Sequence, residues 1–394
     1  MIEGRDIIIY GGDWNWFPSV MERFAHQLAP KNRILWVGSV SIRRPRFHMY
    51  DVKRIGNRLR EMFSTHDPHP NEKILSGKIH PGVIPFYDVP GVKTLNDGLL
   101  RKVIAKKMKE LDFRNVISLP STPMVADVIG TLGESSNHYF CLDDYTQYDG
   151  VYSCVTPLEK VILKKVDSSF ALSEPLQKTR IAASGENHYL PMGVDYDMFN
   201  NCEKSIPSDL AEIKRPIAGF FGQIGSYVDI GLIVRCAKAY PDVSFVLMGR
   251  PHGHIDISPL TREKNIYFLG LIPYEKIAQY ANAFDIALNP RVVNQLSLAM
   301  NPLKIVEYLS VGMPVVSTDL PAVRTFSNVV NIADHADHFV ELIGTALKDT
   351  DISKRKERKS IAEQYSWKNI VERVSGIIER IDSGKHSFSK TTPS

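Results

Sequence analysis

Short apolar runs rich in β-branched residues alternate with segments of helical pattern along most of this chain. A strand followed by a helix and a second strand forms a parallel crossover, so this alternation predicts an α/β fold with parallel sheets. The expected strands cover residues 7–10, 34–37, 116–119, 139–142, 169–172 and 188–190 in the first half, and 217–221, 244–248, 266–268, 286–289, 315–317 and 329–332 in the second. A chain of 394 residues is too long for one core, so we expect two Rossmann-like domains.

Composition indicates a connection between the two halves of the chain. Residues 201–215 are polar and interrupted by Pro207, which indicates a connection between the two halves. We expect a first domain over 1–196, a second over 197–364, a C-terminal helix over 365–385 and a frayed tail over 386–394.

The composition also indicates the cellular compartment in which the protein is expected. No apolar segment approaches the ~20 residues that span a bilayer, and the N-terminus lacks the pattern of a signal peptide. The four cysteines are scattered without paired spacing, so we expect neither a metal site nor a disulfide framework. Free thiols fit a reducing cytoplasm.

The net charge of +4 is unevenly distributed. Residues 31–115 contain 18 Lys and Arg against 8 Asp and Glu. Within them, 42–63 interleave arginines with aromatic residues, and 99–111 predict a helix with one basic face and one apolar face made of Leu100, Val103, Ile104, Met108 and Leu111. Such a surface favours an anionic membrane or a lipid-linked anionic substrate; the alternative is a solvated helix packed on a sheet. No nucleic-acid-binding motif accompanies it, so we do not expect nucleic acid as a partner.

Residues 301–316 predict a complete helix followed by a buried strand. Asn301 is a good N-cap, Pro302 fits the first helical position, and Gly312 can end the helix. Lys304 is unusual in the first turn, where the helix dipole disfavours a cation unless an anion lies between it and the free N–H groups. Glu307 follows on the same face, one turn deeper. The pair suits a nucleotide, with Lys304 at the diphosphate and Glu307 at the ribose hydroxyls; an amphipathic helix with solvated charges is the alternative.

A glycine-rich turn follows the first expected strand, at the edge where parallel sheets bind ligands. It consists of Gly11, Gly12, Asp13 and Trp14, and paired glycines would let a substrate approach the backbone closely. The turn lacks the G-x-G-x-x-G fingerprint, so a nicotinamide-dependent oxidoreductase is disfavoured.

Similar turns occur in the second half. Gly222 and Gln223 follow the strand 217–221, and Gly249 and Arg250 follow the strand 244–248. An arginine directly after a strand could reach the same diphosphate as Lys304. Each glycine alone is ordinary turn chemistry, but their placement after consecutive strands favours a ligand site.

Together these segments resemble the group 1 glycosyltransferases (family 4-like) of the GT-B fold, over nearly the whole chain and most strongly in the second half. The segment 190–199 is similar to the family's interdomain hinge. The segments 265–274 and 285–290, and the helix with Lys304 and Glu307, match the family's donor site. Residues 365–367 resemble the segment that precedes the family's last helix. It implies two Rossmann-like domains facing a cleft, a first that binds the acceptor and a second that binds the nucleotide sugar. It also implies a C-terminal helix that crosses back onto the first domain, and it places Ile272 and Pro273 against the nucleobase.

The resemblance implies a metal-independent glycosyltransferase of the hexosyltransferase type, with no cofactor besides its donor, which we expect to be a UDP-sugar. The most similar members are bacterial enzymes of surface-polysaccharide assembly, of the teichuronic-acid type and, more distantly, the xanthan glucuronosyltransferase. The acceptor would be a lipid-linked or polysaccharide glycan, and the basic first domain would hold the enzyme on the inner face of the cell membrane. Lys304, Arg250 and the backbone around Gly222 would stabilise the departing diphosphate.

One departure from the family pattern leaves the stereochemical outcome open. Retaining members commonly carry two glutamates eight positions apart; Glu307 matches the second, but Ala299 stands at the first. An inverting reaction would need a base, for which Asp143 and Asp144, after the strand 139–142, are the candidates. Neighbours in an extended segment point to opposite faces, so only one is expected to face the cleft, and Asp143 is favoured because retaining relatives often have a histidine there. Helix capping and loop solvation are the alternative roles for this pair.

Two other functions fit the same architecture. A non-hydrolysing nucleotide-sugar epimerase would share the donor pocket, but it normally acts without a basic surface that faces a membrane. An inactive nucleotide-binding scaffold is conceivable because of Ala299.

Overall fold

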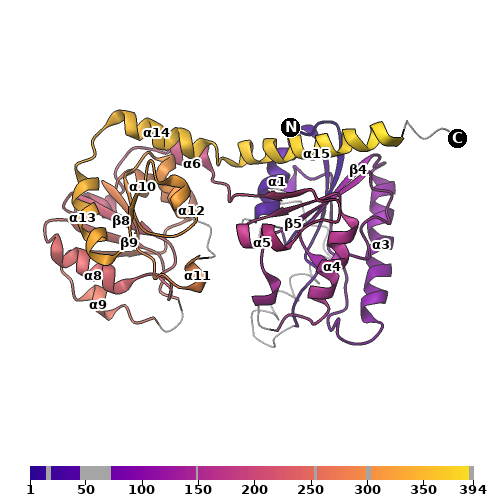
Figure 1. Cartoon of the computed structure of the whole chain (residues 1–394), viewed down its shortest axis with the longest axis horizontal. Coiled ribbons are helices and arrows are strands. Elements are labelled where there is room, and N and C mark those ends of the chain that lie inside the picture. Colours follow the sequence, from indigo (N-terminus) through magenta and orange to yellow (C-terminus); the bar gives the residue numbers. More distant parts are fainter. Residues whose placement is uncertain (15–18, 45–71, 148–149, 253–254, 299–302, 390–394) are drawn as a thin grey trace. The chain divides into compact units, whose positions relative to one another are not determined.

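The computed structural model describes residues 1–14, 19–44, 72–147, 150–252, 255–298 and 303–389 (Figure 1). The chain divides into two compact units, one formed by Met1–Pro191 with Ile370–Ser394 and the other by Met192–Asn369. The first change of unit therefore falls within the hinge-like segment 190–199. Residues 201–215, predicted to connect the halves, lie inside the second unit instead. Leu210 is buried in the core of that unit, and the hydroxyl of Tyr280 donates to both carboxylate oxygens of Asp209, at 2.9 and 2.8 Å.

The first unit is built on a parallel sheet whose strand order is β3-β2-β1-β4-β5-β6-β7. The strands are β1 (Asp6–Tyr10), β2 (Arg33–Val37), β3 (Gly77–Ile79), β4 (Val116–Pro120), β5 (Ser136–Cys141), β6 (Ser168–Ala171) and β7 (Asn187–Tyr189). β1 is buried along its whole length because it lies in the interior of the sheet and helices cover both faces. The chain moves from β1 to β2 and β3 on one side and then returns to β4 on the other, so the switch point of this sheet lies between β1 and β4.

Helices pack on both faces of this sheet. They are α1 (Val20–Leu28), α3 (Val92–Glu110), α4 (Val155–Lys165), α5 (Glu174–Thr179) and α15 (Trp367–Ser389), with short 3₁₀ turns at Ala29–Lys31, Pro123–Val125 and Tyr145–Gln147. The apolar residues of α3 and α4 share one core with β-strand residues such as Ile8 and Tyr139. α1 lies on the opposite face, where the ring of Phe24 meets that of Phe140 edge-on, with centroids 5.0 Å apart.

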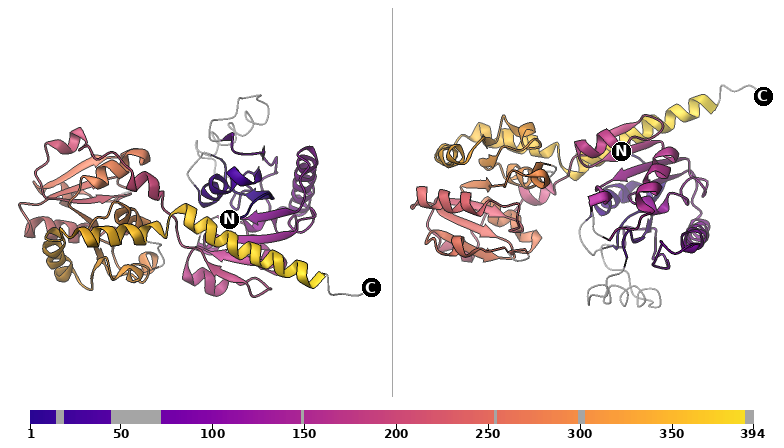
Figure 2. Two further views of the ribbon diagram at one scale, coloured as in Figure 1. Left: turned by 90° about the horizontal axis from the view of Figure 1, so that it is seen from above. Right: turned by 60° about the horizontal axis from the view of Figure 1, so that its bottom comes forward.

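The last helix, α15, belongs mostly to the first unit and runs along it (Figure 2). Its apolar face, made of Ile370, Val371, Val374 and Ile378, is buried. Asp382, further along the helix, accepts a hydrogen bond from Arg5 at 3.1 Å, and the Arg380 guanidinium pairs with Glu186 at 3.0 Å. The C-terminal segment of the chain is therefore fixed to the unit in which the chain begins.

The second unit contains a parallel sheet of order β10-β9-β8-β11-β12-β13. Its strands are β8 (Ile217–Phe221), β9 (Ser244–Met248), β10 (Ile266–Gly270), β11 (Ile286–Asn289), β12 (Val315–Thr318) and β13 (Asn331–Ala333). Its helices are α6 (Tyr196–Asn200), α7 (Ser208–Ala211), α8 (Ile230–Ala239), α9 (Ser258–Thr261), α10 (Tyr274–Asn282), α11 (Gln295–Leu298), α12 (Leu303–Ser310), α13 (Ala336–Leu347) and α14 (Ile352–Glu363), with a 3₁₀ turn at Arg324–Phe326. α10 and α12 share a core on one face of the sheet, and α8 and α13 share a core on the other. The parallel α/β prediction is thus confirmed.

The helix predicted at 99–111 begins earlier, at Val92. The prediction that Val103 belongs to its buried apolar face is wrong. Val103 is 43% exposed rather than packed on the sheet. The buried face uses a spacing of four and consists of Leu100, Ile104 and Met108. Val103 lies beside this stripe and joins Leu95 and Leu99 in a second apolar row that faces solvent. Of the other basic segment, 42–63, residues 45–63 lie outside the described residues.

Candidate functional site

The switch point of the second sheet lies between β8 and β11, because the chain places β9 and β10 on one side of β8 before it returns to β11. Ligands of open parallel sheets bind in the crevice at the carboxyl ends of strands at such a point. The charged and glycine-rich segments of this edge are therefore the candidates for a ligand site.

Lys304 and Glu307 form an ion pair at this edge. The Lys304 ammonium lies 3.0 Å from Oε2 of Glu307, and it also lies over the ring of Phe221, the last residue of β8, at 4.8 Å from the ring centroid. Glu307 has no exposed surface, while a quarter of the Lys304 side chain is exposed. Burial raises the pKa of Glu307, and the neighbouring Lys304 opposes that rise. A carboxylate so enclosed holds the ammonium in place, and only the ammonium is accessible to a ligand.

Two glycine turns meet beside this ammonium. Gly222 and Gly249 have φ angles of +141° and +144°, which residues with a Cβ atom rarely adopt. A Cβ atom on Gly249 would lie 1.9 Å from the carbonyl oxygen of Gly222, and one on Gly222 would lie 3.4 Å from Cε of Lys304. The structure therefore brings Gly222, Gly249 and Lys304 together. The close approach of the two turns explains Gly249, and the positive φ angle explains Gly222.

Other residues predicted for the donor site lie around this centre. The Gln223 carbonyl accepts a hydrogen bond from the Tyr227 hydroxyl at 3.0 Å. Arg250 is exposed in the turn after β9. Ile272 packs on the core, and Pro273 occupies the N-cap position of α10. The predicted Asn301 and Pro302, together with Ala299, lie outside the described residues.

One cation of this edge was not among the residues predicted from the sequence. Arg291 follows β11 directly after Pro290, and its guanidinium lies over the ring of Tyr227, 4.8 Å from the centroid. The only signal for it in the sequence is its place two residues after an apolar strand. That place does not distinguish a buried arginine from an exposed one.

In the first unit, packing accounts for much of the glycine turn after β1. A Cβ atom on Gly11 would lie 2.1 Å from the indole of Trp36, and the Gly12 carbonyl accepts a hydrogen bond from that indole at 3.1 Å. Trp14 is buried and meets Trp36 edge-on, with centroids 4.7 Å apart. Asp13, between them, is partly exposed. The close approach that requires Gly11 is thus made by Trp36.

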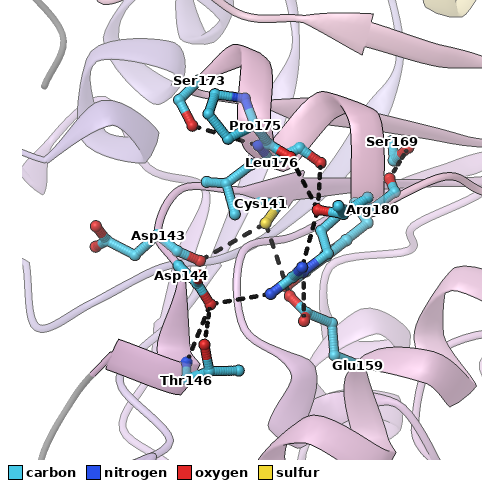
Figure 3. Close-up of polar contacts among 12 residues, drawn as sticks. Cys141, Asp143, Asp144, Thr146, Glu159, Ser169, Ser173, Pro175, Leu176 and Arg180 are labelled. Carbon is cyan, nitrogen blue, oxygen red and sulfur yellow. Dashed lines mark hydrogen bonds and ion pairs between the residues drawn. The ribbon is translucent and has the colours of Figure 1, made fainter. Parts of the chain in front are cut away.

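The two candidate bases have different surroundings (Figure 3). Oδ1 of Asp144 accepts hydrogen bonds from Arg180 at 3.0 Å and from the backbone N–H and hydroxyl of Thr146 at 3.2 and 2.6 Å. Arg180 also donates to the buried carboxylate of Glu159 at 2.9 Å. Asp144 therefore caps the 3₁₀ turn at Tyr145–Gln147 and anchors its loop. Asp143 is exposed, and its carboxylate points away from Arg180 and Glu159.

Within the described ranges, no group of three or more His, Cys, Asp or Glu side chains could hold a metal ion. The same part of the chain contains no helix long and apolar enough to cross a membrane.

We expect Gly249→Ala to destabilise the second unit by about 3 kcal/mol or more, because its Cβ atom would overlap the Gly222 carbonyl in a strained conformation. Urea unfolding measures the loss. Gly98→Ala is the control: Gly98 lies in α3 with nothing within 4 Å of its added Cβ atom, so this change should stabilise by about 0.5–1 kcal/mol. Equal stability of the two variants would contradict the description of the Gly222–Gly249 contact.

Comparison with known proteins agrees with this geometry. Residues 219–349, which contain β8 to β13 and the Lys304–Glu307 pair, match the family model of glycosyl transferases group 1. The chain is 26% identical to the putative teichuronic acid biosynthesis glycosyltransferase TuaH of Bacillus subtilis over 218 residues, which are 52% of this chain and 55% of TuaH. The match thus spans about half the length of that curated relative.

Solved structures resemble the whole chain. Sucrose-phosphate synthase of Thermosynechococcus elongatus superposes with a TM-score of 0.61 at 12% identity, covering 96% of this chain and all of that chain. HepE of Anabaena, in complex with UDP and glucose, has a TM-score of 0.61 at 14% identity and covers 95% of this chain and all of its own. The expected fold class is confirmed: the chain has the GT-B fold, and its second unit contains the segment that matches the family model of glycosyl transferases group 1.

Proposed function

We propose that this protein is a glycosyltransferase that moves a sugar from a UDP-sugar to a lipid-linked or polysaccharide acceptor during synthesis of a bacterial surface glycan. The observation that carries the proposal is the Lys304 ammonium, held by a buried Glu307 beside Gly222 at the switch point of the second sheet. Two similarities support the finer parts: HepE was solved with UDP and glucose, and TuaH is named for teichuronic acid biosynthesis.

The proposed role of Lys304 follows from the charge that develops during the transfer. When the bond between the sugar and the nucleotide breaks, negative charge develops on the departing diphosphate, and a preorganised cation lowers the energy of that state. Lys304 is suited to this role because Glu307 fixes its position before the ligand arrives. In this proposal cationic side chains neutralise the leaving group, so the transfer needs no metal ion.

The donor site is tested by thermal and urea unfolding with UDP, GDP and ADP. UDP at about 100 times its Kd should stabilise the protein by roughly 2.7 kcal/mol, with smaller effects of the other two nucleotides. Lys304→Ala should lose this effect, and Lys276→Ala, which removes an exposed lysine of α10, should keep it.

Because Lys304→Ala leaves a buried carboxylate unpaired, the double variant Lys304→Ala with Glu307→Gln is needed as well. It removes both charges and should fold without binding UDP. A wild-type protein that no nucleotide stabilises, or a double variant that binds UDP normally, would contradict the proposed donor site.

For an inverting reaction we propose Asp143 as the base, since its carboxylate is exposed and points away from Arg180 and Glu159 (Figure 3). Asp143→Asn should lower the rate of transfer by about 10²–10⁴-fold. Asp144→Asn should instead lower stability, because Arg180 and Thr146 lose a charged acceptor. Near-normal transfer by the Asp143 variant would remove it from the mechanism.

We further propose that the exposed row Leu95, Leu99 and Val103 of α3 contacts an anionic membrane near a lipid-linked acceptor. Two exposed lysines, Lys102 and Lys106, lie on the same helix and suit anionic headgroups. A lipid-linked acceptor and a nucleotide-sugar donor would then meet at the cytoplasmic face of the cell membrane.

Liposome sedimentation tests the membrane contact with phosphatidylcholine vesicles that contain increasing fractions of phosphatidylglycerol. Binding should rise with the anionic lipid, and Lys102→Glu with Lys106→Glu should reduce it at least tenfold, since each basic residue contributes about 1 kcal/mol. The matched control changes Lys354 and Lys356, exposed lysines of α14, to Glu and should bind as the wild type does. Binding that is indifferent to anionic lipid would refute the contact.

A further inference from the structure

Arg291 lies at the carboxyl ends of two neighbouring strands of the second sheet. Its backbone N–H donates to the Thr318 hydroxyl at the end of β12, at 3.0 Å. Its Nε donates to the side chain of Asn289, the last residue of β11, at 3.1 Å. The guanidinium plane rests on Tyr227, 4.8 Å from the ring centroid. The backbone N–H, Nε and the guanidinium of this arginine therefore each contact another residue of the protein.

The backbone around Arg291 is paired with the loop that follows the Gly222 turn. Arg291 and Val228 form an antiparallel bridge, and the N–H of Val292 donates to the carbonyl of Tyr227 at 3.1 Å. The N–H of Asp229 donates to the carbonyl of Pro290 at 3.0 Å. The loops after β8 and β11 thus hold Arg291 in a defined position at the switch point of the sheet.

The charge of Arg291 has no counterpart in the described part of the chain. No carboxylate there pairs with it, and its Nη1 is buried without a hydrogen-bond partner. Burial lowers the pKa of Arg291, which reflects the cost of removing the cation from water. By contrast, Lys304 has Glu307, and the buried Arg358 has Asp349. A desolvated guanidinium without an anion is costly, so a purely structural role is a poor account of it.

Arg291 and Lys304 approach the same structural element, the end of β8. Lys304 lies over the Phe221 ring, and the Phe221 N–H donates to the hydroxyl of Tyr308 at 3.1 Å. Arg291 lies over the ring of Tyr227, whose hydroxyl donates to the carbonyl of Gln223 in the turn after β8, at 3.0 Å. One cation of this edge is thus neutralised by the protein and the other is not.

We propose that Arg291 binds an anionic group of the donor, which is either a phosphate of its diphosphate or a carboxylate on its sugar. Planar guanidinium groups bind both anions through paired N–H donors, and the Arg291 side chain is partly exposed at this edge of the sheet. The inference rests on the proposed function, because it assigns Arg291 to the same nucleotide-sugar site, and it names a binding residue that supplements Lys304.

The experiment compares wild type, Arg291→Gln and the control Arg324→Gln by calorimetric titration with UDP, UDP-glucose and UDP-glucuronate. Arg324 lies in the same unit, is exposed and pairs with Asp319, so its variant should bind all three ligands as the wild type does. If Arg291 holds a phosphate, Arg291→Gln weakens all three by a similar factor of about 10–100. If it holds a sugar carboxylate, only UDP-glucuronate is weakened. Either result supports the proposal and identifies the anion.

Stability without ligand provides a second measurement. Arg291→Gln should be at least as stable as the wild type, because it removes a partly buried charge that lacks an anion among the described residues. Unchanged affinity of Arg291→Gln for all three ligands, or reduced stability with unchanged affinity, would overturn the inference while leaving the donor site intact. A wild type that binds none of the three would instead overturn the proposed function itself.

Discussion

The enclosed carboxylate of Glu307 is the constraint on which the second unit's edge depends. A carboxylate with no exposed surface needs compensation, and here the Lys304 ammonium at 3.0 Å and the Tyr274 hydroxyl at 3.4 Å provide it. The Tyr274 hydroxyl also lies 3.2 Å from Asp195, so the start of α10 and the segment before α6 are tied to the same point. The free-energy cost of burying Glu307 is therefore offset by the cation that lies at the end of β8.

Much of the fold could be predicted because buried parallel strands read as continuous apolar runs. The predicted ranges 217–221, 244–248 and 286–289 coincide with β8, β9 and β11. β3, only Gly77–Ile79, was missed because a glycine and a lysine in three residues leave no such run. Val103 was assigned to the wrong face because it neighbours the core residue Ile104, and only the packing of α3 shows where the buried stripe ends.

The site was predictable only where local chemistry is unusual. Lys304 stood out because a cation in the first turn of a helix opposes the dipole, and Glu307 lies one turn away on the same face. The difference between Asp143 and Asp144 could not be seen, because it depends on Arg180, which is 36 residues from Asp144 in the chain. The placement of Arg291 likewise depends on backbone pairing with Val228, more than sixty residues earlier in the chain.

The two cations at the end of β8 illustrate different uses of a partly buried charge. Lys304 is neutralised within the fold, so its position is secured at little cost to stability, and a ligand anion would share it with Glu307. Arg291 receives an aromatic face and one amide acceptor but no anion within the described residues, so its interaction with a ligand anion would not have to compete with a protein carboxylate. A site with both arrangements can keep its shape when empty and still gain strongly from a charged ligand. The unpaired charge of Arg291 then lowers the stability of the free protein and strengthens the binding of a donor anion. Removing this charge should therefore raise the stability of the empty protein and lower its affinity for donor anions.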